Sequence, residues 1–222
     1  IMERLVGSEM CIRDRGKGAP LIPAFHKYLL SEKGTEKLVL NIGGICNGTY
    51  LKDENIVHSS DIGPGNCLLD ATMRNFNLGK FDLDGALASK GNVDSFLLEE
   101  LLSQIDSLPY PRADDLSVYM NLLEKNKKSL NQKNPEDILS TLTELTVKKI
   151  QEYFNFCGAP EKVIFHGGGA ENKYLMHRIK ETIKAEISTI DSLISSKYVE
   201  SAAFAYLAFK ERAVLFLSLI HI

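Results

Sequence analysis

Two glycine-rich segments carry the residues of this sequence that could do chemistry. In the first, an apolar run ends near Asp61 and is followed by Gly63, Pro64, Gly65 and a helical pattern that opens at Asn66. Glycines between a strand and a helix let backbone N–H groups approach an anion, and the helix N-terminus adds its positive dipole. Asp61 cannot itself bind phosphate, and its natural partner there is Mg²⁺ or an ordered water. The alternative is a tight turn in which Asn66 only caps the helix.

The second segment is an apolar strand pattern that ends in three consecutive glycines, Gly167, Gly168 and Gly169. Such a run is entropically costly unless something must approach the backbone closely. A flat purine or a ribose lying over the turn would be such a ligand. Asn172 follows and can cap the next helix. We interpret His166, which precedes the glycines, as a structural histidine rather than a ligand-binding group.

The composition excludes several function classes. The chain has 222 residues, of which 44% are hydrophobic and 25% charged, which suits one domain, or one and a half, with a real core. The net charge of −3 and the lack of a basic patch with interleaved aromatics argue against a nucleic-acid partner. The four scattered cysteines indicate reduced thiols of a cytosolic protein. The apolar end 213–222 is too short to span a bilayer, so no membrane partner is expected.

The spacing of apolar residues predicts three short strands in series, then helices, and then a strand–glycines–helix unit before a last strand and helix. Asn134 followed by Pro135 is a strong start signal for a helix that should run to about Phe156. This order is typical of an α/β fold with a mixed sheet and flanking helices. The predicted strands are 37–42, 45–51, 55–61, 162–166 and 186–190, and the predicted helices are 23–30, 66–76, 92–105, 116–124, 134–156, 173–185 and 198–210.

Several segments of this sequence closely resemble the anhydro-N-acetylmuramic acid kinase family, within the superfamily of actin-like ATPases and sugar kinases. The resemblance covers roughly residues 16–210 and implies the second, C-terminal domain of an actin-like ATPase or sugar-kinase (RNase H-like) fold. The segments that carry it are GAPLIPAFH (18–26), NIGGICN (41–47), DIGPGNCLLD (61–70), FDLDG (81–85), TLTELT (141–146), HGGGAEN (166–172) and ESAAFA (200–205).

The resemblance also implies an activity. Members of this family use ATP and water to open 1,6-anhydro-N-acetylmuramic acid, released in cell-wall (peptidoglycan) recycling, and convert it to N-acetylmuramic acid 6-phosphate. On this reading Asp61 and the turn Gly63–Asn66 face the nucleotide phosphates and Mg²⁺, whereas the glycines 167–169 and Asn172 face the adenosine. A cytoplasmic location and a homodimer are implied in the same way.

The sequence departs from the family pattern in three places. No Gly-Thr-Ser-x-Asp-Gly loop is present, so we expect a C-terminal domain at 16–210, flanked by segments 1–15 and 211–222 that we leave out of the fold argument. By ungapped count the position of the family's catalytic Asp is Cys11, and Asp14, three residues later, is the nearest candidate base. The sequence 112–116 replaces a Lys-Ser-Thr-Gly-Arg-like loop, which leaves the sugar-binding residues unknown.

Three hypotheses follow. The first is a part of this sugar kinase that is inactive by itself, because half of an ATP cleft cannot position both reactants. The second is another amino-sugar kinase of the same superfamily. The third is a non-catalytic nucleotide-binding relic.

Overall fold

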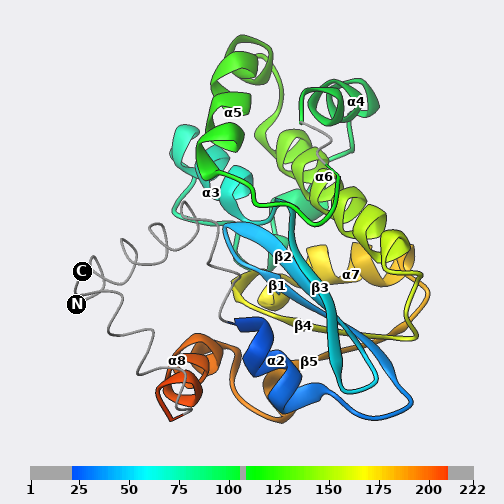
Figure 1. The fold of residues 1–222 in the computed structure, drawn as a ribbon. Helices are drawn as coiled ribbons and strands as arrows, with labels where there is room; N and C mark the ends of the chain where they lie inside the picture. The colour runs from blue at the N-terminus through cyan, green and yellow to red at the C-terminus, as the bar shows by residue number, and fades with distance from the viewer. Residues whose placement is uncertain (1–21, 106–108, 210–222) are drawn as a thin grey trace, which may run out of the picture.

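Five strands form one mixed sheet in the order β3-β2-β1-β4-β5 (Figure 1). The computed structural model describes residues 22–105 and 109–209. The strands are β1 (Glu36–Ile42), β2 (Ile45–Lys52), β3 (Asn55–Pro64), β4 (Lys162–His166) and β5 (Glu186–Thr189). The first three pair antiparallel, and β4 and β5 continue the sheet parallel to β1. The predicted mixed sheet, with three strands in series, is therefore confirmed, and the carboxyl ends of β1 and β4 lie side by side.

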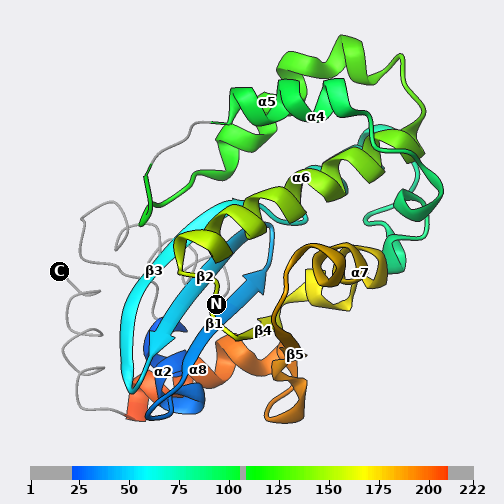
Figure 2. The same cartoon turned by 90° about the vertical axis from the view of Figure 1, so that its right-hand side faces the viewer.

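Helices cover both faces of this sheet (Figure 2). On one face lie α6 (Pro135–Phe156) and α7 (Lys173–Thr182), and on the other lie α2 (Ile22–Leu30) and α8 (Val199–Phe209). Alternate residues of a strand point to opposite faces. In β1, accordingly, Leu38 and Leu40 pack toward α6 and α7, whereas Val39 packs toward α2 and α8.

The long helix α6 forms where the sequence predicts it. The Asn134 side chain accepts a hydrogen bond from Glu136 N, and Pro135 occupies the first turn, where its missing N–H costs nothing. The helix runs for 22 residues to Phe156. Because its second half packs on the sheet and its first half extends beyond it, α6 joins the sheet to a group of smaller helices.

Those smaller helices are α3 (Cys67–Asn75), α4 (Ser95–Gln104) and α5 (Leu116–Leu130), and they form a second core against α6. Helix α4 begins later than the predicted start at residue 92 because the Asp94 carboxylate caps it at Leu97 N. Helix α5 is longer than the predicted 116–124, since Leu130 still packs into the core. Short 3₁₀ helices lie at η1 (Leu83–Gly85), η2 (Ala88–Lys90), η3 (Gly168–Glu171), η4 (Ile190–Ser192) and η5 (Ser196–Tyr198).

The end of β3 differs from the prediction. The strand does not stop at Asp61 but continues through Gly63 to Pro64, which pairs with Ile45 of β2. Proline is tolerated here because β3 is an edge strand, where a missing N–H leaves no ladder partner unsatisfied. Asp61 therefore lies within a strand, and the turn into α3 is made by Gly65 and Asn66.

Two findings bear on the function classes excluded above. Across the described residues, no helix combines the length and the apolar character that a membrane span requires. The cysteines in these ranges, Cys46, Cys67 and Cys157, are buried free thiols. The predictions for Cys11, Asp14 and the terminal segments 1–15 and 211–222 concern residues outside the described ranges.

Candidate functional site

The start of α3 is fastened to the hairpin turn between β1 and β2. The N–H groups of Gly65 and Cys67 donate to the Gly44 carbonyl at 2.9 and 3.1 Å, and Asn66 N donates to the Gly43 carbonyl at 2.8 Å. A Cβ atom on Gly65 would lie 2.4 Å from the Gly43 oxygen, so only glycine allows this approach. The predicted anion-binding amides of Gly65 and Asn66 are thus already engaged within the protein.

The three glycines after β4 differ in what they allow. Gly167 has a φ of 84°, and a Cβ on it would lie 2.3 Å from Asn41 Oδ1. A Cβ on Gly169 would lie 2.2 Å from Ile42 Cγ2. The fold itself therefore requires these two glycines. A Cβ on Gly168 would meet only Asn66 Nδ2, at 3.8 Å, so protein packing does not explain this glycine.

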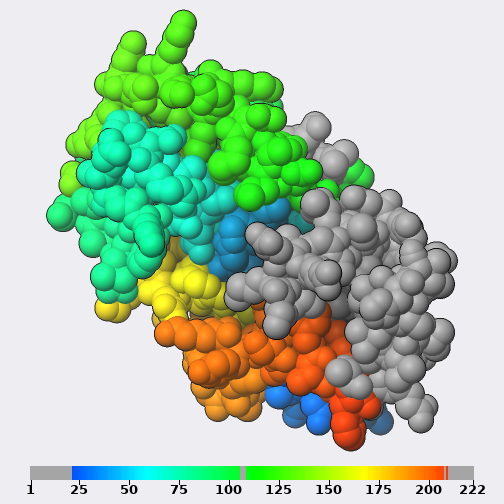
Figure 3. Space-filling view, turned by 90° about the vertical axis from the view of Figure 1, so that its left-hand side faces the viewer, coloured from blue at the N-terminus to red at the C-terminus, as the bar shows by residue number. Residues whose placement is uncertain are grey.

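A hollow of about 300 Å³ opens beside Gly168. It is lined by the first turn of α3, the loop that follows α3 and the turn between β4 and α7. In the space-filling view these segments, cyan to green and yellow, lie against one another (Figure 3). Its lining includes Asn66, Asp70, Phe81, Asp82, Leu83, Asp84, Glu171 and Asn172. Ligands of open α/β sheets bind outside the carboxyl ends of parallel strands, which is where this hollow lies.

The carboxylates around the hollow are not equivalent. Asp82 accepts hydrogen bonds from Leu87 N and Ala88 N, both at 2.9 Å, and so fixes the loop after α3. Asp84 pairs with Lys173 Nζ at 2.8 Å. The Asp70 backbone N–H donates to the Asn66 carbonyl at 2.8 Å, but its side-chain carboxylate forms no hydrogen bond or ion pair with any other described residue. Burial raises the pKa of the Asp70 carboxyl, and the nearby Arg74 opposes that shift.

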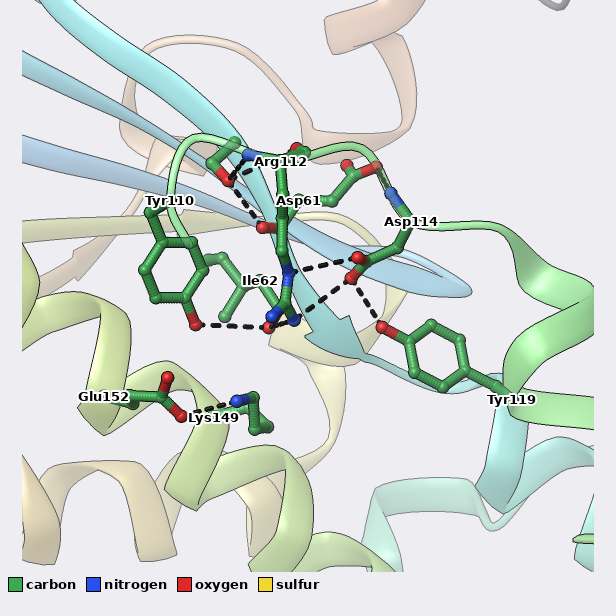
Figure 4. Close-up of polar contacts among 9 residues, drawn as sticks. Asp61, Ile62, Tyr110, Arg112, Asp114, Tyr119, Lys149 and Glu152 are labelled. Carbon is green, nitrogen blue, oxygen red and sulfur yellow. Dashed lines mark hydrogen bonds and ion pairs between the residues drawn. The ribbon is translucent and has the colours of Figure 1, made fainter. Parts of the chain in front are cut away.

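Asp61 is held by a loop far along the chain. The segment 109–115, here called the strap, runs along the end of β3 (Figure 4). Asp61 N donates to the Arg112 carbonyl at 3.0 Å, and Asp114 N donates to Asp61 Oδ2 at 2.8 Å. Asp61 does not line the hollow, and at least one of its carboxylate oxygens is occupied by the strap. Its predicted contact with phosphates and Mg²⁺ stays a prediction.

A buried ion pair stabilises the strap. Arg112 Nε lies 3.0 Å from Asp114 Oδ1, with only 3% and 10% of the two side chains exposed. Arg112 also donates to the Ile62 carbonyl, and the Tyr119 hydroxyl donates to Asp114 Oδ2 at 2.5 Å. Burial and the Asp114 carboxylate both raise the pKa of Tyr119. The ion pair and the hydrogen bonds offset the free-energy cost of burying the charges of Arg112 and Asp114.

We expect Tyr119→Phe to lower the free energy of unfolding by about 1–2 kcal/mol, because it removes a hydrogen bond to a buried carboxylate. Urea unfolding followed by circular dichroism measures this difference. Tyr198→Phe is the matched control, since Tyr198 is 64% exposed, and it should change stability by less than about 0.5 kcal/mol. Equal effects of the two substitutions would show that the hydrogen bond to Asp114 contributes nothing.

His166 is buried and hydrogen-bonded. Its Nε2 lies 3.0 Å from His26 Nε2, and His26 Nδ1 lies 3.0 Å from Thr49 Oγ1. Only 1% of His26 and 2% of His166 are exposed. Burial lowers the pKa of His26 to about 3 and that of His166 to about 4. The interpretation of His166 as a structural histidine is therefore confirmed.

The other predicted site residues fall into two groups. Asn66, Gly168 and Asn172 line the hollow, and the Asn172 side chain also caps α7 by accepting from Leu175 N, as predicted. The remaining predicted residues contact other parts of the protein and not the hollow. Gly63 packs on Lys149, and the Pro64 carbonyl accepts a hydrogen bond from Thr146 Oγ1. Three glycines pack on the β1–β2 hairpin: Gly65, Gly167 and Gly169. Their roles toward a ligand stay predictions.

Sequence reasoning missed several residues of this site. Asn41, near the end of β1, and Gly43 and Gly44, which follow the strand, lie at the same end of the sheet as the glycines after β4, because β1 and β4 are parallel neighbours. The available signal was a Gly-Gly pair at the end of an apolar strand. Asp70 and Phe81 were missed as lining residues because no local pattern shows that α3 and the following loop fold over the glycine turn.

The donor groups do not form a metal cage by themselves. Within 22–105 and 109–209, no group of three or more His, Cys, Asp or Glu side chains is placed to hold a metal ion. Magnesium at nucleotide sites needs only one or two carboxylates, with waters and phosphates supplying its other ligands. The carboxylates of the described residues are enough for magnesium ligation of that kind, and Mg²⁺ at this site stays a prediction.

Fold and site together define a class of protein: a domain of the actin-like ATPase and sugar-kinase fold. A solved structure of the activator of the 2-hydroxyisocaproyl-CoA dehydratase from Clostridium difficile, with bound ADPNP, matches with a TM-score of 0.54. The match has 13% sequence identity and covers 82% of this chain and 62% of that one. At this identity it shows the fold alone.

The family follows from sequence comparison. The model of the anhydro-N-acetylmuramic acid kinase family matches residues 10–216, and the chain belongs to this family of kinases. Relatives of that name from Gamma-proteobacterium EBAC31A08 and Shewanella oneidensis are 37% and 38% identical over 198 and 200 residues. Each match covers 88% of this chain but 54% of the relative, so the chain spans about half the length of these relatives.

Proposed function

We propose that this chain is the nucleotide-binding, C-terminal part (16–210) of a kinase that opens 1,6-anhydro-N-acetylmuramic acid and phosphorylates it to N-acetylmuramic acid 6-phosphate. The observation that carries this proposal is the hollow beside Gly168, a glycine that protein packing does not require, in a member of this kinase family. A neighbour of the same fold holds ADPNP, which supports ATP as the phosphoryl donor.

Within this proposal the adenosine lies in the hollow, against Gly168 and Asn172. The phosphates lie toward Gly43 and Gly44, the turn between the end of β1 and the start of β2, which is hydrogen-bonded to the start of α3. Asp61, whose carboxylate also accepts from Asp114 N, is the candidate for orienting Mg²⁺. Bound Mg²⁺ would neutralise charge on the phosphate oxygens during transfer.

The reaction needs a general base, a water and a closed cleft. The base takes a proton from the water, which attacks the anomeric carbon. The bond from that carbon to O6 breaks, and O6 then takes the γ-phosphoryl group while ADP leaves. Asp14 stays the candidate base. The described residues would contribute positioning: they hold the nucleotide at the sheet edge and exclude water from one side of it.

The setting of the reaction is part of the proposal. It includes a substrate released from peptidoglycan, a cytoplasmic location and a homodimer, all implied by the family resemblance. They are tested with the full-length relatives rather than with this chain.

We expect this chain alone to bind ADP but to turn over anhydro-N-acetylmuramic acid at least about 10³-fold more slowly than the Shewanella oneidensis relative. Positioning both reactants is worth several kcal/mol of barrier, and this chain spans about half of that relative. Calorimetry measures ADP binding, and a coupled ADP-release assay measures turnover.

The relative, assayed in parallel, is the control for substrate and assay. Turnover by this chain at the rate of the relative would contradict the expectation that it is inactive alone. Failure to bind ADP at millimolar concentration would contradict the proposed nucleotide site. Turnover of other amino sugars, but not this one, by the relative would point to another specificity.

A further inference from the structure

Asp70 lines the hollow, and its carboxylate has no hydrogen-bond or ion-pair partner among the described residues. It lies in the first turn of α3, where the helix dipole favours its ionised form. Asp70 is half-buried, yet no other described residue forms a hydrogen bond or ion pair with its carboxylate. Partly buried carboxylates in proteins normally have partners. A ligand with hydrogen-bond donors would supply partners for the Asp70 carboxylate.

The neighbouring carboxylates do not have this capacity. Both oxygens of Asp82 accept backbone N–H groups, and Asp84 is paired with Lys173. Glu171, at the other side of the hollow, is exposed to solvent and can satisfy its oxygens with water. Asp70 is therefore the carboxylate of the hollow with the most capacity to accept hydrogen bonds from a bound ligand.

The position of Asp70 along α3 indicates which part of a nucleotide it would meet. Asn66 lies at the hairpin end of the hollow, and Asp70 follows four residues later on the same helix face, about 6 Å along the axis. One sugar ring spans a distance of this order. Two other residues of the hollow, Phe81 and Leu83, have exposed apolar side chains suited to a flat base.

We infer that Asp70 is a specificity-determining residue that accepts hydrogen bonds from the ribose 2′ and 3′ hydroxyls of the bound nucleotide. The inference rests on the proposed function, because it needs a nucleotide in the hollow. It assigns the ribose to the first turn of α3, the phosphates to the hairpin side and the base to the rim at Phe81 and Leu83. A carboxylate that faces two adjacent hydroxyls distinguishes a ribonucleotide from its dideoxy form.

The test compares ADP with 2′,3′-dideoxy-ADP, each with MgCl₂, by calorimetry on the 222-residue chain. The native chain should bind ADP about tenfold or more tightly, the effect expected of hydrogen bonds to a charged acceptor. Asp70→Ala should bring the two dissociation constants within about threefold of each other. Alanine is the best helix former, so α3 should persist in this variant, and a thermal melt checks that it does.

The matched control separates hydrogen bonding from charge. Asp70→Asn and Asp84→Asn remove the same charge from the same hollow, and asparagine tolerates the φ of 58° at Asp84. Asp84→Asn should change binding of both nucleotides by the same factor and leave their ratio unchanged. Asp70→Asn should reduce the ratio.

Each outcome has one meaning. ADP binding without discrimination by the native chain, or discrimination that survives Asp70→Ala, overturns the role of Asp70 and leaves the nucleotide site standing. If neither ADP nor dideoxy-ADP binds, the proposed function is overturned, and the role of Asp70 is overturned with it.

Discussion

Replacing Gly168 by valine will abolish nucleotide binding by this chain and leave its fold intact. A Cβ on Gly168 meets only Asn66 Nδ2, at 3.8 Å, and this residue lines the hollow. The two methyl groups of valine would therefore project into space that the protein does not use and the nucleotide needs. We expect the affinity for ADP to fall at least about 100-fold, since overlap with a ligand atom costs several kcal/mol. Calorimetry measures the affinity and a thermal melt measures the fold.

The adjacent glycines provide the control for this experiment. A Cβ on Gly169 would lie 2.2 Å from Ile42 Cγ2, so Gly169→Ala should destabilise the protein by about 1–3 kcal/mol through overpacking. The pair of substitutions thus separates a glycine kept for a ligand from a glycine kept for packing. Retained ADP binding in Gly168→Val would place the nucleotide elsewhere. A large loss of melting temperature in that variant would show that packing, not ligand access, fixes this glycine.

Local signals in the sequence account for most of the fold. Asn134 and Pro135 predict the start of α6, and Asn172 predicts the start of α7, because capping is decided by residues within one turn. The strands around Leu38 and Phe165 are apolar runs bounded by glycines, which is the pattern of buried strands. The end of β3 is missed because tertiary structure decides it: Pro64 stays in this strand because the strand is at the sheet edge.

The candidate site was predictable only in part, for a physical reason. The sequence indicates the glycines after β4 because three in a row have no other local use. It cannot show that Asp61 meets Asp114, 53 positions away, because no periodicity relates a strand to a loop beyond two helices. It also cannot separate Gly168 from Gly167 and Gly169, since the difference lies in what faces each Cβ position. The residues that the sequence misses are those that the three-dimensional fold brings to the hollow, such as Asp70.

Acid will destabilise this protein through the buried pair His26 and His166. Both side chains are neutral in the folded state, because burial lowers their pKa values to about 3 and about 4. In the unfolded chain they take up protons near pH 6.5. Between about pH 6.5 and 4 the unfolded state therefore binds protons that the folded state does not, and the free energy of unfolding falls as the pH falls. From pH 7 to pH 5 the loss is about 2 kcal/mol for each histidine.

Urea unfolding at several pH values from 7 to 5 measures this dependence. His166→Gln should flatten it by about 2 kcal/mol or more, because it removes one buried histidine and leaves His26 without its partner. His177→Gln is the control, since the His177 side chain is 64% exposed, and it should leave the dependence unchanged. His26 lies on α2 and His166 directly precedes the glycine turn, so protonation would also loosen the turn that lines the hollow. If the dependence stays equally steep in His166→Gln, carboxylates rather than this pair set the sensitivity to acid.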